Sequence, residues 1–284
     1  MAERLNRVIE LIESGKPAFG PFVPAGSIPD ATWIASSNYD FVVYELEHNA
    51  FNLSDLSLSL QYMLNRRQIL ESGSLVPAVT PMVRIPVNGR EQSQWIVKQV
   101  LDIGVYGIVF PMINTPDDAI AALQAARYIQ ADDAPDQEPV GRRGHAPGNA
   151  LRYWGLDQPD YFDRADVWPL DPNGEILPIL QCETIEGVNN LPAILDAVPK
   201  PGLILISESD LSVSLGQKGQ PGPLVDEAVQ RARAVCQERS VPYGSPQVDM
   251  SNVDQRIDEG FSFLMPGPAR VSEALNRGRE LAGR

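Results

Sequence analysis

Residues 97–119, VKQVLDIGVYGIVFPMINTPDDA, contain the end of a helix, a strand and the start of the next helix. Trp95, Ile96, Val100 and Ile103 recur at the spacing of one helical face, and the run GIVFPM at 107–112 then predicts a buried strand. Thr115 followed by Pro116 and two aspartates is a strong helix start, because the hydroxyl caps free amides and the acids face the positive end of the helix dipole. This order is typical of a βαβ unit around a parallel sheet.

The same alternation extends over the whole chain. Short apolar runs that predict strands lie at residues 18–23, 41–45, 82–86, 107–112, 176–182, 203–207, 241–245 and 261–266. Eight strands separated by helices predict an α/β protein, a (β/α)8 TIM barrel in which residues 1–284 form a single domain. An extra N-terminal helix is expected around Leu5, Val8, Ile9 and Ile12. Residues 66–78 and 130–169 fit this pattern poorly, and segments of that length are usually functional lids or interface elements.

Composition restricts the classes of partner. The 284 residues carry a net charge of -14 and a pI near 4.6, which argues against binding to nucleic acid or to an anionic membrane surface. The N-terminal sequence has charges in its first helical turns, so neither a signal peptide nor a membrane span is predicted. Cys182 and Cys236 are too few for a disulfide framework, and a cytoplasmic location is expected.

Polar side chains gather where the predicted strands end, which is where the reactive groups of such barrels lie. Glu45, Glu47 and His48 follow the second run, Arg84 lies in the third, Gln181 and Glu183 end the fifth, and Asp210 follows the sixth. Carboxylates that meet there repel one another unless a cation intervenes, and a hard divalent ion would take Glu183 and Asp210 as direct ligands. Glu45 and Glu47 would accept hydrogen bonds from water on that ion.

Each residue also has a purely structural interpretation. Glu183 could be a loop acid, Asp210 could cap the short helix that follows it, Arg84 could be an ion-pair partner, and His48 could close a turn. His145 is interpreted as a loop residue. The coincidence of polar groups at four strand ends favours the functional interpretation.

Two kinds of chemistry are disfavoured. A Schiff-base enzyme needs a desolvated lysine inside the barrel. The lysines are Lys16, Lys98, Lys200 and Lys218; three adjoin Gly or Pro in predicted turns and Lys98 lies on a predicted helix. The phosphate-binding patterns GxxxxGK[ST] and GxGxxG are absent, so nucleotide binding is not expected.

With these motifs in hand, the chain resembles the HpcH/HpaI family of metal-dependent (class II) pyruvate aldolases, such as 4-hydroxy-2-oxoheptanedioate aldolase. The resemblance covers nearly the whole chain and includes GKPAFG, YELEHNAF, PMVRIP, GRRG, LQCETIEGVNN and SDLSVSLG. It implies cleavage of a 4-hydroxy-2-oxo acid to pyruvate and an aldehyde, or the reverse, with Mg²⁺, Mn²⁺ or Co²⁺ as cofactor. It also implies a homo-oligomer, usually a hexamer.

The resemblance assigns a role to each matching residue. It makes His48 the acid/base, oriented by Asp102 of the VLDIG segment, and Arg84 the arginine that binds substrate. The metal ligands are then Glu183 and Asp210, and Gln181, Ser209 and Asp210 contact the substrate.

One departure from the family pattern concerns the sixth strand. Family members usually carry Gly-Pro immediately before the [AS]D motif, where backbone amides meet the pyruvate carboxylate, whereas this chain has Ser207 and Glu208. An inward-pointing Glu208 would repel that carboxylate. Two alternatives therefore stay open: an acyl-CoA-ester lyase related to the citrate lyase β-subunit and malyl-CoA lyase, and an altered barrel that serves as a binding or assembly protein.

Overall fold

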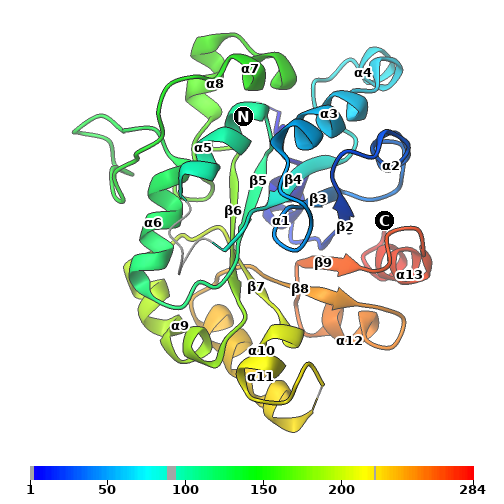
Figure 1. Cartoon of the computed structure of the whole chain (residues 1–284), viewed down its shortest axis with the longest axis vertical. Coiled ribbons are helices and arrows are strands. Elements are labelled where there is room, and N and C mark those ends of the chain that lie inside the picture. The colour runs from blue at the N-terminus through cyan, green and yellow to red at the C-terminus, as the bar shows by residue number, and fades with distance from the viewer. Residues whose placement is uncertain (1–2, 88–93, 221) are drawn as a thin grey trace.

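The computed structural model describes residues 3–87, 94–220 and 222–284 (Figure 1). Its centre is one sheet of nine parallel strands in the order β1-β9-β8-β7-β6-β5-β4-β3-β2. The first predicted run forms two of these strands, β1 (Ala18–Phe19) and β2 (Phe22–Pro24). β1 pairs with β9 and β2 pairs with β3. The two strands at the ends of this order, β1 and β2, are therefore consecutive in the chain. This is a TIM-barrel-like arrangement.

Gly20 separates β1 from β2. A Cβ atom at this position would lie 2.2 Å from the backbone oxygen of Phe41, which is far too close for any side chain. The neighbouring amides complete the pairing, because Gly20 N–H donates to Leu264 and Asp40 N–H donates to Phe19. Glycine is therefore required where the sheet passes from β1 to β2.

The other seven predicted runs each overlap a strand. They are β3 (Phe41–Glu45), β4 (Thr80–Arg84), β5 (Gly107–Phe110), β6 (Leu177–Cys182), β7 (Leu203–Ile206), β8 (Tyr243–Val248) and β9 (Phe263–Pro266). β4 begins two residues earlier than predicted, and β8 extends three residues further and contains an irregular register between Ser245 and Val248. The alternation of strands and helices is confirmed.

Helices follow the strands and surround the sheet (Figure 1). The helices that return the chain to the next strand are α2 (Ile28–Ile34), α3 (Leu53–Met63), α5 (Gln94–Ile103), α6 (Pro116–Ala126), α9 (Ile185–Ala197), α11 (Pro223–Glu238) and α12 (Val253–Asp258), and α13 (Glu273–Leu281) follows β9. α6 begins as predicted, since the Thr115 hydroxyl accepts from Asp118 N–H while the Asp118 carboxylate accepts from Thr115 N–H.

The buried side chains form two clusters, one inside the curled sheet and one between the sheet and its helices. Leu177 and Ile179 of β6 belong to the inner cluster, whereas Leu180 and Cys182 belong to the outer one. Alternate side chains of β6 therefore point to opposite faces of the sheet, and Leu177 and Ile179 point inward. Helix α1 (Arg7–Glu13) places Val8, Ile9 and Leu11 in the inner cluster.

The long segments between strands carry short helices. Residues 66–78 contain α4 (Arg66–Ser72), and residues 130–169 contain α7 (Gly148–Trp154) and α8 (Gln158–Arg164). The Trp154 ring stacks on Tyr106 at 4.5 Å, and its Nε1–H donates to the Gly104 oxygen at 2.9 Å. Since Tyr106 directly precedes β5, α7 packs at the amino-terminal edge of the sheet. Within the described ranges, no helix has the length and apolar character needed to cross a membrane.

Candidate active site

The predicted site residues converge on the carboxyl-terminal edge of the sheet. Glu45 ends β3, Arg84 ends β4, Glu183 follows β6 and Ser207 follows β7. The strands are parallel and paired in sequence order, with Glu45 directly opposite Arg84 and Cys182 opposite Ile206. All four strand ends therefore face the same end of the sheet, as the sequence predicts.

Arg84 is held in a single orientation by Glu45. Its Nε donates to Glu45 Oε2 at 2.7 Å, Nη2 donates to the same oxygen, and the guanidinium carbon lies 4.3 Å from the centre of the Phe22 ring. Glu45 Oε1 accepts the backbone N–H groups of Glu47 (2.7 Å) and His48 (3.2 Å). Protein donors thus contact both oxygens of Glu45, and its contact with water on a metal stays a prediction.

Glu47 lies between Arg84 and His48. Its Oε2 is 3.2 Å from Arg84 Nε and 3.6 Å from His48 Nε2. This oxygen is buried and has no hydrogen bond, because the Nε–H of Arg84 is directed to Glu45. Burial raises the pKa of Glu47, although Arg84 and His48 act in the opposite direction. The His48 side chain is 67% exposed, so this carboxylate connects a buried cation to an imidazole open to solvent.

Glu183 is the most perturbed acid at this edge. Its Oε1 accepts from Met112 N–H at 2.6 Å, and its Oε2 accepts from Gln181 Nε2. Burial first, and then the charges of Asp210 and Glu47, raise its pKa to about 8. Met112 supplies its amide from a left-handed backbone conformation (φ +57°), which is costly for a residue with a side chain and typical of functional sites.

The surroundings of Glu183 fit a divalent cation. The negative charges of Asp210 and Glu47 act on the Glu183 carboxylate, and the buried Oε1 of Gln181 and Oε2 of Glu47 have no hydrogen-bond partner. Asp210 lies in the first turn of α10 (Glu208–Ser214), where its Oδ2 accepts from the Ser207 hydroxyl at 2.9 Å and Ser209 is exposed. Hard oxygen ligands in this number suit Mg²⁺ or Mn²⁺, which take one or two carboxylates and keep several waters.

Asp102 lies at the opposite edge of the sheet in this chain. Its Oδ1 accepts from Arg143 Nη2 at 2.8 Å, and it sits near the end of α5, which runs back to the amino-terminal edge before β5 begins. His48 follows the opposite, carboxyl-terminal end of β3. In the described part of the chain Glu47 is the carboxylate that contacts this imidazole, 3.6 Å from Nε2, and the orientation of His48 by Asp102 stays a prediction.

Arg143 lies in the GRRG motif, and the sequence alone predicts no role for it. The Arg143 side chain is fully buried; it donates to Tyr161 at 2.7 Å and lies 4.4 Å from the centre of the Tyr128 ring. These contacts join the 141–143 segment to α5 and α8, which makes its role structural in the described part of the chain.

Glu208 points along the edge toward the next βα unit. Its carboxylate pairs with Arg256 of α12, and its backbone N–H donates to Gln247 Oε1 at 3.2 Å. Burial raises the pKa of Glu208, and the nearby Arg256 acts against that rise. No sequence signal identified Arg256, which is 48 residues away on a helix of ordinary composition.

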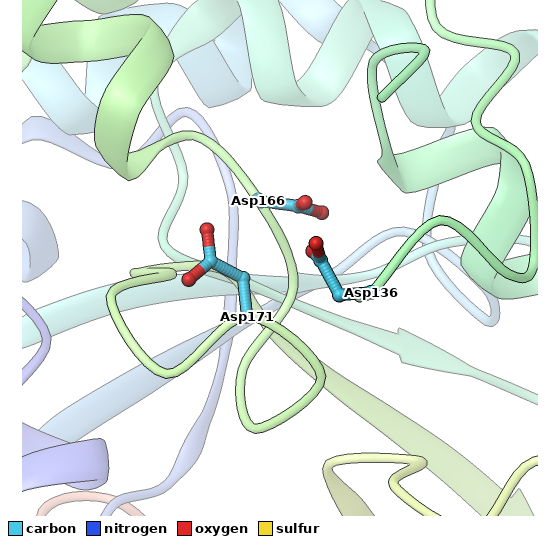
Figure 2. A group of neighbouring side chains, drawn as sticks. All are labelled: Asp136, Asp166 and Asp171. Carbon is cyan, nitrogen blue, oxygen red and sulfur yellow. The ribbon is translucent and has the colours of Figure 1, made fainter. Parts of the chain in front are cut away.

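A second acidic cluster lies at the opposite edge (Figure 2). One oxygen each of Asp136, Asp166 and Asp171 lies within 4.8 Å of the others, and Figure 2 shows the Asp136 and Asp166 carboxylates close together. Buried Arg127 already donates to both oxygens of Asp166 and to Asp136, each at 2.8 Å. Asp166 is bonded through its backbone to Ile176, just before β6, so the cluster is about 20 Å from Glu183, the length of six extended residues. A guanidinium therefore supplies the positive charge here.

Comparison with known proteins identifies related sequences over nearly the whole chain. The sequence model of the HpcH/HpaI aldolase/citrate lyase family matches residues 19–268. A hydroxypyruvate/pyruvate aldolase of Paraburkholderia phytofirmans is 25% identical over 93% of this chain and 92% of its own length. A 4-hydroxy-2-oxo-heptane-1,7-dioate aldolase of Shigella sonnei is 28% identical over 93% of this chain and 91% of its own.

A solved structure agrees with the sequence matches. A protein of Burkholderia cenocepacia described as an HpcH/HpaI aldolase/citrate lyase family member superimposes with a TM-score of 0.72 at 26% identity, covering 97% of both chains.

Proposed function

The chain belongs to the HpcH/HpaI aldolase/citrate lyase family, and on this premise we propose that it is a divalent-metal-dependent aldolase. Its substrates would be 4-hydroxy-2-oxo acids, which it would cleave to pyruvate and an aldehyde, or form from them. The two aldolases above, similar over more than nine-tenths of the chain, support this reaction class.

The observation that carries the proposal is the environment of Glu183. The buried Glu183 carboxyl lies near Asp210 and Glu47 and has a pKa of about 8. This raised pKa indicates that the protein supplies too little positive charge there to balance the three acids. Glu183 and Asp210 would hold a divalent cation, which when bound supplies that charge and withdraws electrons from the oxygens of a 2-oxo acid. The Met112 amide and the Gln181 side chain would keep Glu183 oriented toward it.

His48 is proposed to carry the proton. In the cleavage direction its imidazole takes the proton of the 4-hydroxyl group, the bond between C3 and C4 breaks, and the aldehyde leaves. The electrons of the broken bond remain on the pyruvate half as an enolate, which takes up a proton at C3 to give pyruvate. Glu47, 3.6 Å from Nε2, would stabilise the imidazolium that forms.

Arg84 is proposed to stabilise the negative charge that develops on the 2-oxo group. Glu45 and the Phe22 ring fix its guanidinium before substrate arrives, so little reorganisation is needed during the reaction. Gln181, whose Oε1 has no partner, and Ser209 on the exposed turn would contact the substrate.

The half-reaction can be tested without knowing the aldehyde. Exchange of the pyruvate methyl hydrogens for deuterium would be followed by NMR with Mg²⁺, Mn²⁺ or Co²⁺ added, and with EDTA as the metal-free control. His48→Ala should lower the exchange rate by about 10²–10⁴-fold. His145→Ala, which removes the chain's other histidine, stacked on Phe162, should leave it unchanged. Exchange that is independent of metal, or of His48, would contradict the proposal.

A further inference from the structure

The Glu208–Arg256 pair joins the candidate site to its neighbouring βα unit. Glu208 is the first residue of α10 and lies two residues before the proposed ligand Asp210. Its carboxylate accepts from Arg256 Nη2, and its side chain is 22% exposed against 10% for Arg256. A carboxylate in this position would ordinarily add negative charge to the helical turn that carries Asp210.

Arg256 is fixed by contacts on several sides. Nη1 donates to Glu259 Oε2 at 3.0 Å, while the guanidinium carbon lies 5.1 Å from the centre of the Phe261 ring. Gln247 holds the Glu208 backbone at the same time, through the amide of that residue. The Glu208 carboxylate is thus kept on the α12 side of the edge, because the Arg256 guanidinium that it pairs with is itself held in place.

We propose that Arg256 determines how well the site accepts anionic substrates, by cancelling the charge of Glu208 and holding its carboxylate against α12. The inference rests on the proposed function only in the substrate class, which is a small 2-oxo carboxylate. Removing the guanidinium would leave Glu208 as an unpaired negative charge in the helical turn that carries Asp210. An anion would then be repelled, whereas a divalent cation would be attracted.

This pair of opposite effects distinguishes a charge role from damage to the fold. Mn²⁺ binding would be measured by electron paramagnetic resonance, and oxalate, a dianionic mimic of the pyruvate enolate, would be titrated calorimetrically into the Mn²⁺-loaded protein. Arg256→Met keeps most of the apolar stem and should weaken oxalate binding about tenfold, or ~1.4 kcal/mol. It should leave Mn²⁺ binding unchanged or slightly tighter, whereas a distorted site would lose both ligands.

Matched variants isolate the charge. Glu208→Gln combined with Arg256→Met should restore the oxalate affinity to within about twofold, because no unpaired acid remains in the turn that carries Asp210. Arg256→Lys, which retains the positive charge, should stay within about threefold of the wild type. If Arg256→Met fails to fold, Glu208→Gln alone decides the question, since it removes one negative charge while Arg256 stays paired with Glu259, and it should tighten oxalate binding.

The possible outcomes separate the two proposals. Unchanged oxalate affinity in Arg256→Met, parallel loss of Mn²⁺ and oxalate, or no recovery in the double variant would overturn the role of Arg256. Wild-type protein that binds Mn²⁺ and oxalate but does not exchange pyruvate would contradict the aldolase reaction, and the oxalate affinities would still decide the role of Arg256. Wild-type protein that binds no oxalate would overturn both.

Discussion

The free energy of unfolding of the metal-free protein should fall as the pH rises, and replacing Glu183 by glutamine should abolish the part of that fall that Glu183 causes. In the folded protein this carboxyl has a pKa of about 8, raised from an ordinary 4.5 mainly by burial. Between these values the folded state keeps a proton that the unfolded state has lost, so the free energy of unfolding falls as the pH increases through that interval and stays low above it.

The size of the effect follows from the two values. Linkage gives a loss of at most ~3.5 kcal/mol between pH 5 and pH 8, and water penetration would reduce it. In a chain of this length the melting temperature would fall by roughly 7–14 °C. Glutamine has no such proton, and it can still accept from the Met112 amide, while Gln181 can rotate to offer its unpartnered Oε1.

The assay is urea unfolding, followed by tryptophan fluorescence in EDTA at pH 5 and pH 8. Other groups titrate in both proteins, so the informative quantity is the difference between variant and wild type at each pH. Glu183→Gln should be the more stable protein at pH 8 and should gain much less at pH 5. Glu186→Gln, an exposed acid three residues further on, serves as the control and should show no such change.

Divalent metal provides the second arm of the experiment. Mn²⁺ needs the ionised carboxylate, so it should stabilise the wild type more at pH 8 than at pH 5 and should stabilise Glu183→Gln weakly at both. If the two proteins lose stability in parallel as the pH rises, the strained carboxylate cluster does not exist and the reasoning is refuted.

Three further substitutions test separate parts of the structure. Asp166→Asn should destabilise the protein by ~3–5 kcal/mol in urea unfolding, since it leaves the buried Arg127 charge without its main partner; an unchanged midpoint would contradict that pairing. Gly20→Ala places a methyl group 2.2 Å from the Phe41 oxygen and should cost more than ~2 kcal/mol, measured by thermal unfolding; a stable variant would mean that the sheet closes differently there. Arg84→Lys should fold normally but lower pyruvate exchange by about 10²-fold, because lysine cannot repeat the fixed guanidinium geometry; wild-type exchange would remove arginine from the mechanism.

Much of the architecture was predictable because it depends on local patterns. Eight apolar runs separated by helix-period segments predicted the strand and helix order. The convergence of Glu45, Arg84, Glu183 and Asp210 on one edge also follows from sequence, because parallel strands must end at the same side. The short helices α7 and α8 were missed, since their Asp, Pro and Gly content resembles that of a loop.

The partner of each charged group, in contrast, was decided by the tertiary structure. The family resemblance predicts that Asp102 orients His48, which stays a prediction, and the direction of Glu208 could not be read from the sequence. In the folded chain Asp102 pairs with Arg143 and Glu208 pairs with Arg256. Periodicity reports which face of an element is buried, but an ion pair depends on distances of a few ångströms between elements that are far apart along the chain. Only the packing of α5, α8, α10 and α12 determines those distances, and with them the charge that a substrate meets at the carboxyl-terminal edge.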